Sequence, residues 1–158
     1  MKKILTALAL ALTAALAGCA ISPATDSKVW MTGNTAMVEQ QTVRLESNLW
    51  IDMMPKIGET TALVKEQTLH GALNLVTDTQ LPADMDVAMV VLKQGDVSWE
   101  FEGDDFELRN HSENQWEVAF NWQLEVNITK PVDVAVQLVG GDKQTWVVNK
   151  QVNVDTVY

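Results

Sequence analysis

The chain has 158 residues, of which 47% are hydrophobic and 20% are charged, and its formal net charge at pH 7 is −10. A chain of this length and apolar content can bury a core, which excludes general disorder. Its negative charge disfavours nucleic acid as a partner, and it disfavours anionic lipid surfaces unless cations bridge the two, because like charges repel.

Residues 1–18 have the pattern of a removable export signal. Lys2 and Lys3 precede an apolar and small-residue run over 4–17, which is shorter than the roughly 20 apolar residues of a transmembrane helix. Removal of this signal leaves residues 19–158, with nine basic and 21 acidic residues and a formal charge of −12. A chain of this length is one domain.

The end of the signal reads Leu16-Ala17-Gly18-Cys19, which resembles the lipobox of bacterial lipoproteins. The resemblance covers only the signal, and it implies cleavage before Cys19, acylation of its sulfur and often of the new amino terminus. Two or three acyl chains anchor a protein stably on a bilayer, whereas a single chain gives only weak and reversible binding. The alternative is an ordinary signal peptide with a cysteine near its end by chance. Cys19 is the only cysteine, so the domain has no disulfide.

The residue after the cysteine bears on localisation. In lipoproteins of bacteria with two membranes, an aspartate at this position commonly retains the protein at the inner membrane, and here it is Ala20. The resemblance therefore implies a lipid anchor in the outer membrane, on the periplasmic side. The inner membrane, or the surface of a cell with a single membrane, is the alternative.

Residues 19–29 are predicted to be the lipidated cysteine and a tether, followed by one domain over 30–158. The eight residues Ala20–Ser27 are small or polar and include a proline. At about 3.3 Å per extended residue they reach about 26 Å, which keeps the domain near the bilayer.

Beyond residue 30, apolar and polar residues alternate, as in antiparallel strands with one buried face. Segment 85–92 is apolar on both faces, which predicts a central strand covered on both sides. Segment 116–129 is long enough to require a bulge or bend. Segment 56–67 is ambiguous between a short helical turn and a loop. The predicted strands cover 43–53, 69–75, 85–92, 97–101, 106–108, 116–129, 132–138 and 146–154, with turns at 103–105 and 140–143.

Seven to nine short strands predict an all-β fold, an antiparallel β-sandwich with Greek-key connections. The pattern resembles immunoglobulin and fibronectin type III domains in architecture only. The Cys–Trp–Cys framework of immunoglobulin domains is absent, and the sole tyrosine is Tyr158.

Candidate metal ligands are scattered. A copper site would draw on histidines and methionines, and a calcium site on an acidic run, but neither set has the spacing of a known metal motif. Core methionines and a solvated strand face explain the same residues. The sets are His70, His111, Met53, Met54, Met85 and Met89 for copper, and Glu100, Glu102, Asp104 and Asp105 for calcium. No cofactor is predicted. Because no nucleophile motif is present either, the chain is not predicted to be an enzyme.

Tryptophan is the abundant aromatic residue, with six copies. Four of them lie on apolar faces and are assigned to the core: Trp99, Trp116, Trp122 and Trp146. Trp50 instead shares a face with polar residues. Together with Met54 and Trp30 it is predicted to form an exposed apolar patch for a partner. The alternative is that an amino-terminal strand or loop covers Trp50.

These observations predict a non-enzymatic protein-binding or assembly module of the cell envelope. It would contact the lipid bilayer through acylated Cys19 and bind an envelope protein. The alternative is a carrier of a metal, copper or calcium, or of a small ligand, with an enzyme as the third possibility.

Overall fold

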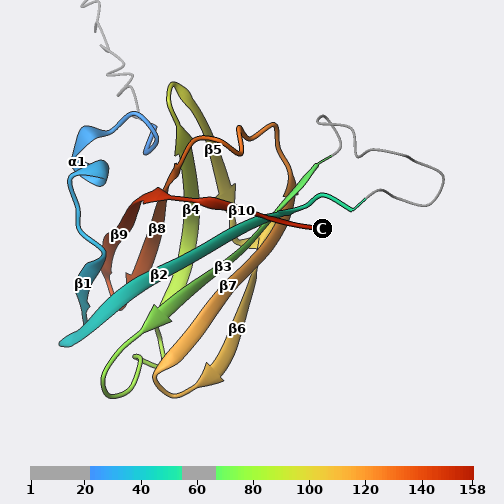
Figure 1. Cartoon of the computed structure of the whole chain (residues 1–158). Helices are drawn as coiled ribbons and strands as arrows, with labels where there is room; N and C mark the ends of the chain where they lie inside the picture. Colours follow the sequence, from blue (N-terminus) through green and yellow to red (C-terminus); the bar gives the residue numbers. More distant parts are fainter. Residues whose placement is uncertain (1–21, 55–66) are drawn as a thin grey trace, which may run out of the picture.

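The computed structural model describes residues 22–54 and 67–158, and this part of the chain folds into two β-sheets and one short helix (Figure 1). The elements are α1 (Ser27–Trp30), β1 (Thr35–Val38), β2 (Gln41–Asp52), β3 (Thr68–Val76), β4 (Asp86–Gln94), β5 (Val97–Glu102), the 3₁₀ turn η2 (Gly103–Asp105), β6 (Glu107–Ser112), β7 (Gln115–Gln123), β8 (Val132–Gly140), β9 (Lys143–Val152) and β10 (Val154–Val157).

The six-stranded sheet has the order β1-β2-β3-β7-β6, with β10 also paired to β2, and the four-stranded sheet has the order β5-β4-β8-β9. Neighbouring strands are antiparallel except β10, which runs parallel to β2 with Val154 opposite Leu49. Because Leu49 pairs with Gly71 of β3 on its other side, β1 and β10 share one edge of β2. The all-β class is therefore confirmed.

The number of strands differs from the prediction, since the described residues hold ten and not seven to nine. The additional strands are β1 and β10, each of four residues. Four residues are too few for an alternating pattern to stand out in a sequence. Both strands form because the edge of β2 offers backbone partners.

The core lies between the two sheets and contains the predicted apolar faces. On β2, Val43, Leu45 and Ile51 are fully buried. The inward faces of β3 and β8 are also fully buried, at Leu69, Leu73 and Leu75 on β3 and at Val132, Val134 and Val136 on β8. One cluster joins these side chains across both sheets, as the alternation predicts.

The predicted strand over 116–129 is wrong in its length, because β7 ends at Gln123. Val126 is buried in the same core, but from a connection and not from a strand. The side chain of Asn127 accepts a hydrogen bond from the Thr129 backbone N–H at 2.9 Å, a local turn that competes with strand pairing. The alternation of apolar residues therefore continues in the sequence beyond the last residue of the strand.

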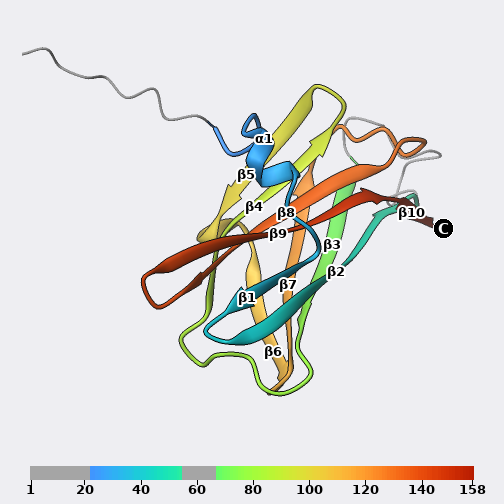
Figure 2. The same cartoon turned by 90° about the vertical axis from the view of Figure 1, so that its left-hand side faces the viewer.

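Strand β4 is covered on both sides, as predicted. Val90 and Leu92 point into the main core, while Val91 lies in a second cluster with Val29 and Trp30. Figure 2 shows α1 in front of the four-stranded sheet. Packing against this sheet therefore begins before residue 30.

This packing corrects the predicted tether, because Ala24 and Val29 are 4% and 5% exposed. The side chain of Asp26 caps α1 by accepting a hydrogen bond from the Lys28 backbone N–H at 2.9 Å. Cys19 and almost all of the ambiguous segment 56–67 lie outside the described residues. Among the described residues, no helix has the length and apolarity to span a bilayer.

Candidate functional site

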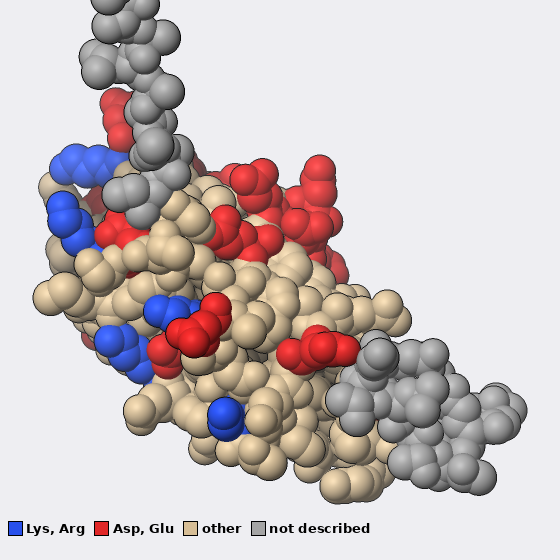
Figure 3. Space-filling model, turned by 90° about the horizontal axis from the view of Figure 1, so that it is seen from above, with Lys and Arg blue, Asp and Glu red and all other residues tan. Residues whose placement is uncertain are grey.

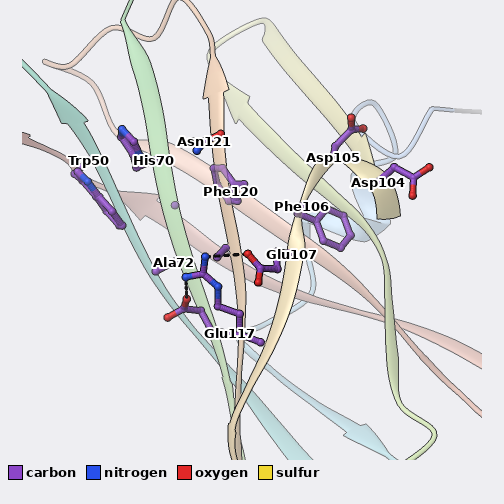
Figure 4. A pocket seen from close by; sticks show the side chains of 13 residues that line it. Trp50, His70, Ala72, Asp104, Asp105, Phe106, Glu107, Glu117, Phe120 and Asn121 are labelled. Carbon is purple, nitrogen blue, oxygen red and sulfur yellow. Dashed lines mark hydrogen bonds and ion pairs between the residues drawn. The ribbon is translucent and has the colours of Figure 1, made fainter. Parts of the chain in front are cut away.

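The outer face of the six-stranded sheet carries a hollow of about 600 Å³, lined by residues of β2, β3, β7, β6 and η2 (Figure 4). Its floor is made by Ala72 and Ala119, which are register partners on β3 and β7. The next row of the sheet carries the larger side chains of Trp50, His70 and Asn121. Two alanines between rows of long side chains leave the sheet surface open.

One wall of the hollow is an aromatic stack. The rings of Trp50 and His70 are nearly parallel, at 10°, with centroids 5.5 Å apart. Trp50 is half-buried, and its neighbour on the free side of β2 is Asp155 of β10. The strand next to Trp50 on this edge of β2 is therefore carboxy-terminal, and no described residue before Trp50 lines the hollow.

The opposite wall is charged. Arg109 of β6 forms ion pairs with Glu107 at 2.9 Å and with Glu117 at 3.4 Å, and Figure 4 shows Glu107 and Glu117 with this network. His111 Nε2 lies 3.2 Å from the Glu117 carboxylate. The hydrogen bond from Arg109 lowers the pKa of Glu107 and raises the pKa of the Arg109 guanidinium. Both side chains therefore remain charged near neutral pH.

Acidic groups outnumber basic ones around the hollow, because Asp104 and Asp105 of η2 also line it. Figure 3 shows a dense group of acidic side chains along one border of the end of the molecule seen from above. A binding partner for the hollow, which is lined by more acidic than basic groups, would need basic groups on the surface that faces it.

The position of η2 at the rim depends on an inner aromatic stack. The ring of Trp122 lies between those of Phe101 and Phe120, at centroid distances of 3.4 and 3.6 Å. Its Nε1 donates a hydrogen bond to the Asp105 carbonyl at 2.6 Å. A Cβ at Gly71 would overlap the Phe120 ring. Gly71 thus makes room for the stack that holds the acidic rim, a role that its place in an alternating pattern does not reveal.

The structure separates the residues predicted to bind a partner. Trp50 borders the hollow, and Met54, just after β2, is 54% exposed. Trp30 is 8% exposed, and its Nε1 donates to the Ala24 carbonyl at 3.0 Å. It packs on the four-stranded sheet, so its assignment to an exposed patch with Trp50 is wrong.

Sequence reasoning missed an exposed apolar side chain near Trp50. Asp155 is the register partner of Trp50 and Val157 that of Asp52. Because 155 and 157 share a face of β10, Val157 lies on the same side of the sheet as Trp50, and it is 46% exposed. The sequence did not reveal this position of Val157, because β10 has only four residues and its pairing with β2 cannot be inferred from so short a pattern.

The other tryptophans lie against the apolar clusters. Trp122 is buried in the main core, Trp99 and Trp116 are partly buried against it, and Trp146 packs on the second cluster. These positions agree with the assignment of the four to packing.

The candidate metal ligands are dispersed within the residues that the structure covers. No group of three or more His, Cys, Asp or Glu side chains there could hold a metal ion. His70 stacks on Trp50, and His111 is paired with Glu117. Met85 belongs to the main core and Met89 packs on the second cluster. The copper and calcium alternatives gain no support from this arrangement.

Comparison of the chain with protein-family models, curated proteins and solved structures gives no match.

Proposed function

We propose that this chain is a lipid-anchored, non-enzymatic binding module of the bacterial cell envelope. Acylated Cys19 would hold it on the periplasmic side of the outer membrane, and the outer face of the six-stranded sheet would bind a protein. The observation that carries the proposal is Trp50, which is half-buried beside an open hollow and stacked on His70.

The chemistry of this face fits a protein partner. Binding hot spots are enriched in tryptophan and arginine, and they lie among contacts that exclude water. Here Trp50 and Arg109 stand on opposite sides of a floor of small side chains. Exposed Met54 and Val157 add apolar area at the same end of β2. A partner with an apolar anchor and basic surroundings would complement this arrangement.

The strand order supports an immunoglobulin-type Greek key as the finer architecture. Such domains place strands A, B, E and D in one sheet and C, F and G in the other, with C′ added in variable-type domains. The order β2-β3-β7-β6 against β5-β4-β8-β9 has the same connections. In this proposal, β1 and β10 are additions to the edge of β2.

The proposed anchor and the proposed non-enzymatic role both rest on the sequence. The lipobox-like Leu16-Ala17-Gly18-Cys19 supports lipidation, and Ala20 supports the outer membrane. The proposal of a non-enzymatic role rests on the lack of a nucleophile motif in the sequence.

Crosslinking in intact native cells, followed by purification of the full chain, tests this function. We expect a defined adduct with a second protein, which Trp50→Ser removes. Met37→Ser is the control, because Met37 is 63% exposed on β1 and lies outside the hollow. No adduct, or equal loss in both variants, would refute the proposed partner surface. In parallel, Cys19→Ala should abolish incorporation of labelled palmitate; unchanged incorporation would refute the anchor.

A further inference from the structure

We propose that two copies of this chain pair edge to edge through β6, in a two-fold symmetric antiparallel arrangement that continues the six-stranded sheet. The proposal concerns an edge of the sheet. It shares Glu107 and Arg109 with the hollow, but it does not require that a partner binds at Trp50.

The first observation is that β6 ends the sheet. Within the described residues it pairs only with β7, and all six of its residues are exposed. Strands with a free edge present unpaired backbone N–H and C=O groups that can pair with another chain. A bulge between Asn110 and Ser112 restricts regular pairing to the first part of β6.

The second observation is charge complementarity. In the register that sets Leu108 opposite Leu108 of the second copy, Glu107 of each chain faces Arg109 of the other. Directly opposed residues of antiparallel strands have Cβ atoms about 4.5–5.5 Å apart, within reach of an ion pair. Both side chains are exposed and so are available for this exchange. The two Leu108 side chains, each 37% exposed, would meet at the axis.

Neighbouring registers of the same symmetry are unfavourable. If the two-fold axis passes through Arg109, the two Arg109 side chains lie opposite each other. If it passes through Glu107, the two Glu107 side chains lie opposite each other. Like charges directly opposed on a sheet are destabilising. The sequence Glu107-Leu108-Arg109 therefore selects one register.

The end strand β5 of the other sheet shows the contrast. Its charged residues are Glu100 and Glu102, so two copies would bring only negative charges together. Complementarity is a property of β6 and not of every open edge in this fold. This identifies a second copy of the chain as the occupant of the β6 edge.

The symmetry has a structural consequence. Antiparallel pairing about an axis perpendicular to the sheet leaves both outer faces on the same side. Because Glu107 and Arg109 line the hollow, the two hollows would lie on either side of the axis and form one double surface.

Disulfide capture in intact cells tests the pairing on the full chain. Opposed Cα atoms in antiparallel strands are about 4.5–5.5 Å apart, which suits a disulfide. Leu108→Cys should give a disulfide-linked dimer under a mild thiol oxidant. Ser98→Cys, an exposed position on β5, is the matched control. If Leu108→Cys gives no more dimer than Ser98→Cys, the proposal is overturned.

Charge exchange between chains then tests the register. In the Leu108→Cys background, Arg109→Glu should lower the dimer yield at least about fivefold, because it opposes like charges. Arg44→Glu disrupts an equivalent pair with Glu46 on β2 and should change the yield less than about twofold. Coexpression of differently tagged Glu107→Arg and Arg109→Glu chains should favour the mixed dimer over either homodimer at least about fivefold. No preference for the mixed dimer would overturn the assigned register.

Discussion

The two sheets of this molecule differ in what lies on their outer faces. On the four-stranded sheet, Val91, Ala135 and Val148 are apolar, and the segment 22–30 of the same chain packs on them. On the six-stranded sheet the central outer positions are Ala72 and Ala119, bordered by polar and charged residues. In the described part of the chain, the apolar outer face is covered by the chain itself, whereas the face of small and polar residues carries the hollow. Among residues 22–54 and 67–158, no segment packs on the outer face of the six-stranded sheet as 22–30 packs on the other, and this is the face proposed to bind a partner.

The largest expected effect comes from uncovering the four-stranded sheet. Trp30→Ala removes a buried indole and its hydrogen bond to Ala24, and we expect a loss of about 3 kcal/mol in the free energy of unfolding. Met31→Ala is the control, because Met31 is 82% exposed, and it should cost less than about 0.5 kcal/mol. Denaturant unfolding measures both. Equal small effects would show that the segment is not part of the fold.

The next effect concerns the stack beneath the hollow. Gly71→Ala places a methyl group in the space of the Phe120 ring, and overpacking of this kind costs about 2 kcal/mol. Gly33→Ala meets no atom within 4 Å and should leave the unfolding free energy within about 0.5 kcal/mol of the parent. The same denaturant experiment compares the two. If Gly71→Ala is as mild as Gly33→Ala, the close approach of Phe120 is not required.

Trp50→Ala should separate stability from binding. Since Trp50 is half-buried and stacked on one ring, we expect a loss of about 1 kcal/mol in stability. Partner binding should weaken at least about tenfold, as for a hot-spot tryptophan. Affinity measured with the protein recovered by crosslinking tests this, alongside the melting curve. A large stability loss with unchanged affinity would make Trp50 a core residue.

The smallest effect is electrostatic and local. Arg109 lowers the pKa of Glu107, so their interaction is present above the ordinary pKa of glutamate and is lost as pH falls through the lowered value. Arg109→Gln should raise the Glu107 pKa toward the ordinary range. NMR titration of the Glu107 carboxyl group measures this change. A titration midpoint that does not move would contradict the pairing.

Local patterns were sufficient for the buried faces of the longer strands. They were not sufficient for the short strands β1 and β10, for the end of β7, or for the segment that packs on the four-stranded sheet. Alternation identified the buried faces of β2, β3 and β8, because one face of each strand is predominantly apolar. It also indicated that β4 is covered on both sides. It did not identify the cover, because the composition of 22–28 is that of a linker. The signals present were the helix cap at Asp26 and the apolar pair Val29-Trp30.

The candidate site was only partly predictable for a similar reason. Trp50 shares its face of β2 with polar residues, and this indicated that it lies outside the core, where the structure places it. The hollow needs Ala72 opposite Ala119, and these residues are far apart in sequence, so their register is invisible to a local pattern. Trp30 and Trp50 look equivalent as exposed aromatic candidates until the two sheets are known.

The contrast between the two outer faces can be tested most directly by site-specific photocrosslinking in native cells. A photoreactive residue in place of Asn121, exposed on β7 beside His70, should yield a discrete adduct with a second protein. The same residue in place of Ser98, exposed on β5 of the four-stranded sheet, should yield none. An adduct from Ser98 alone, or equal adducts from both positions, would contradict the assignment of the partner surface to the six-stranded sheet.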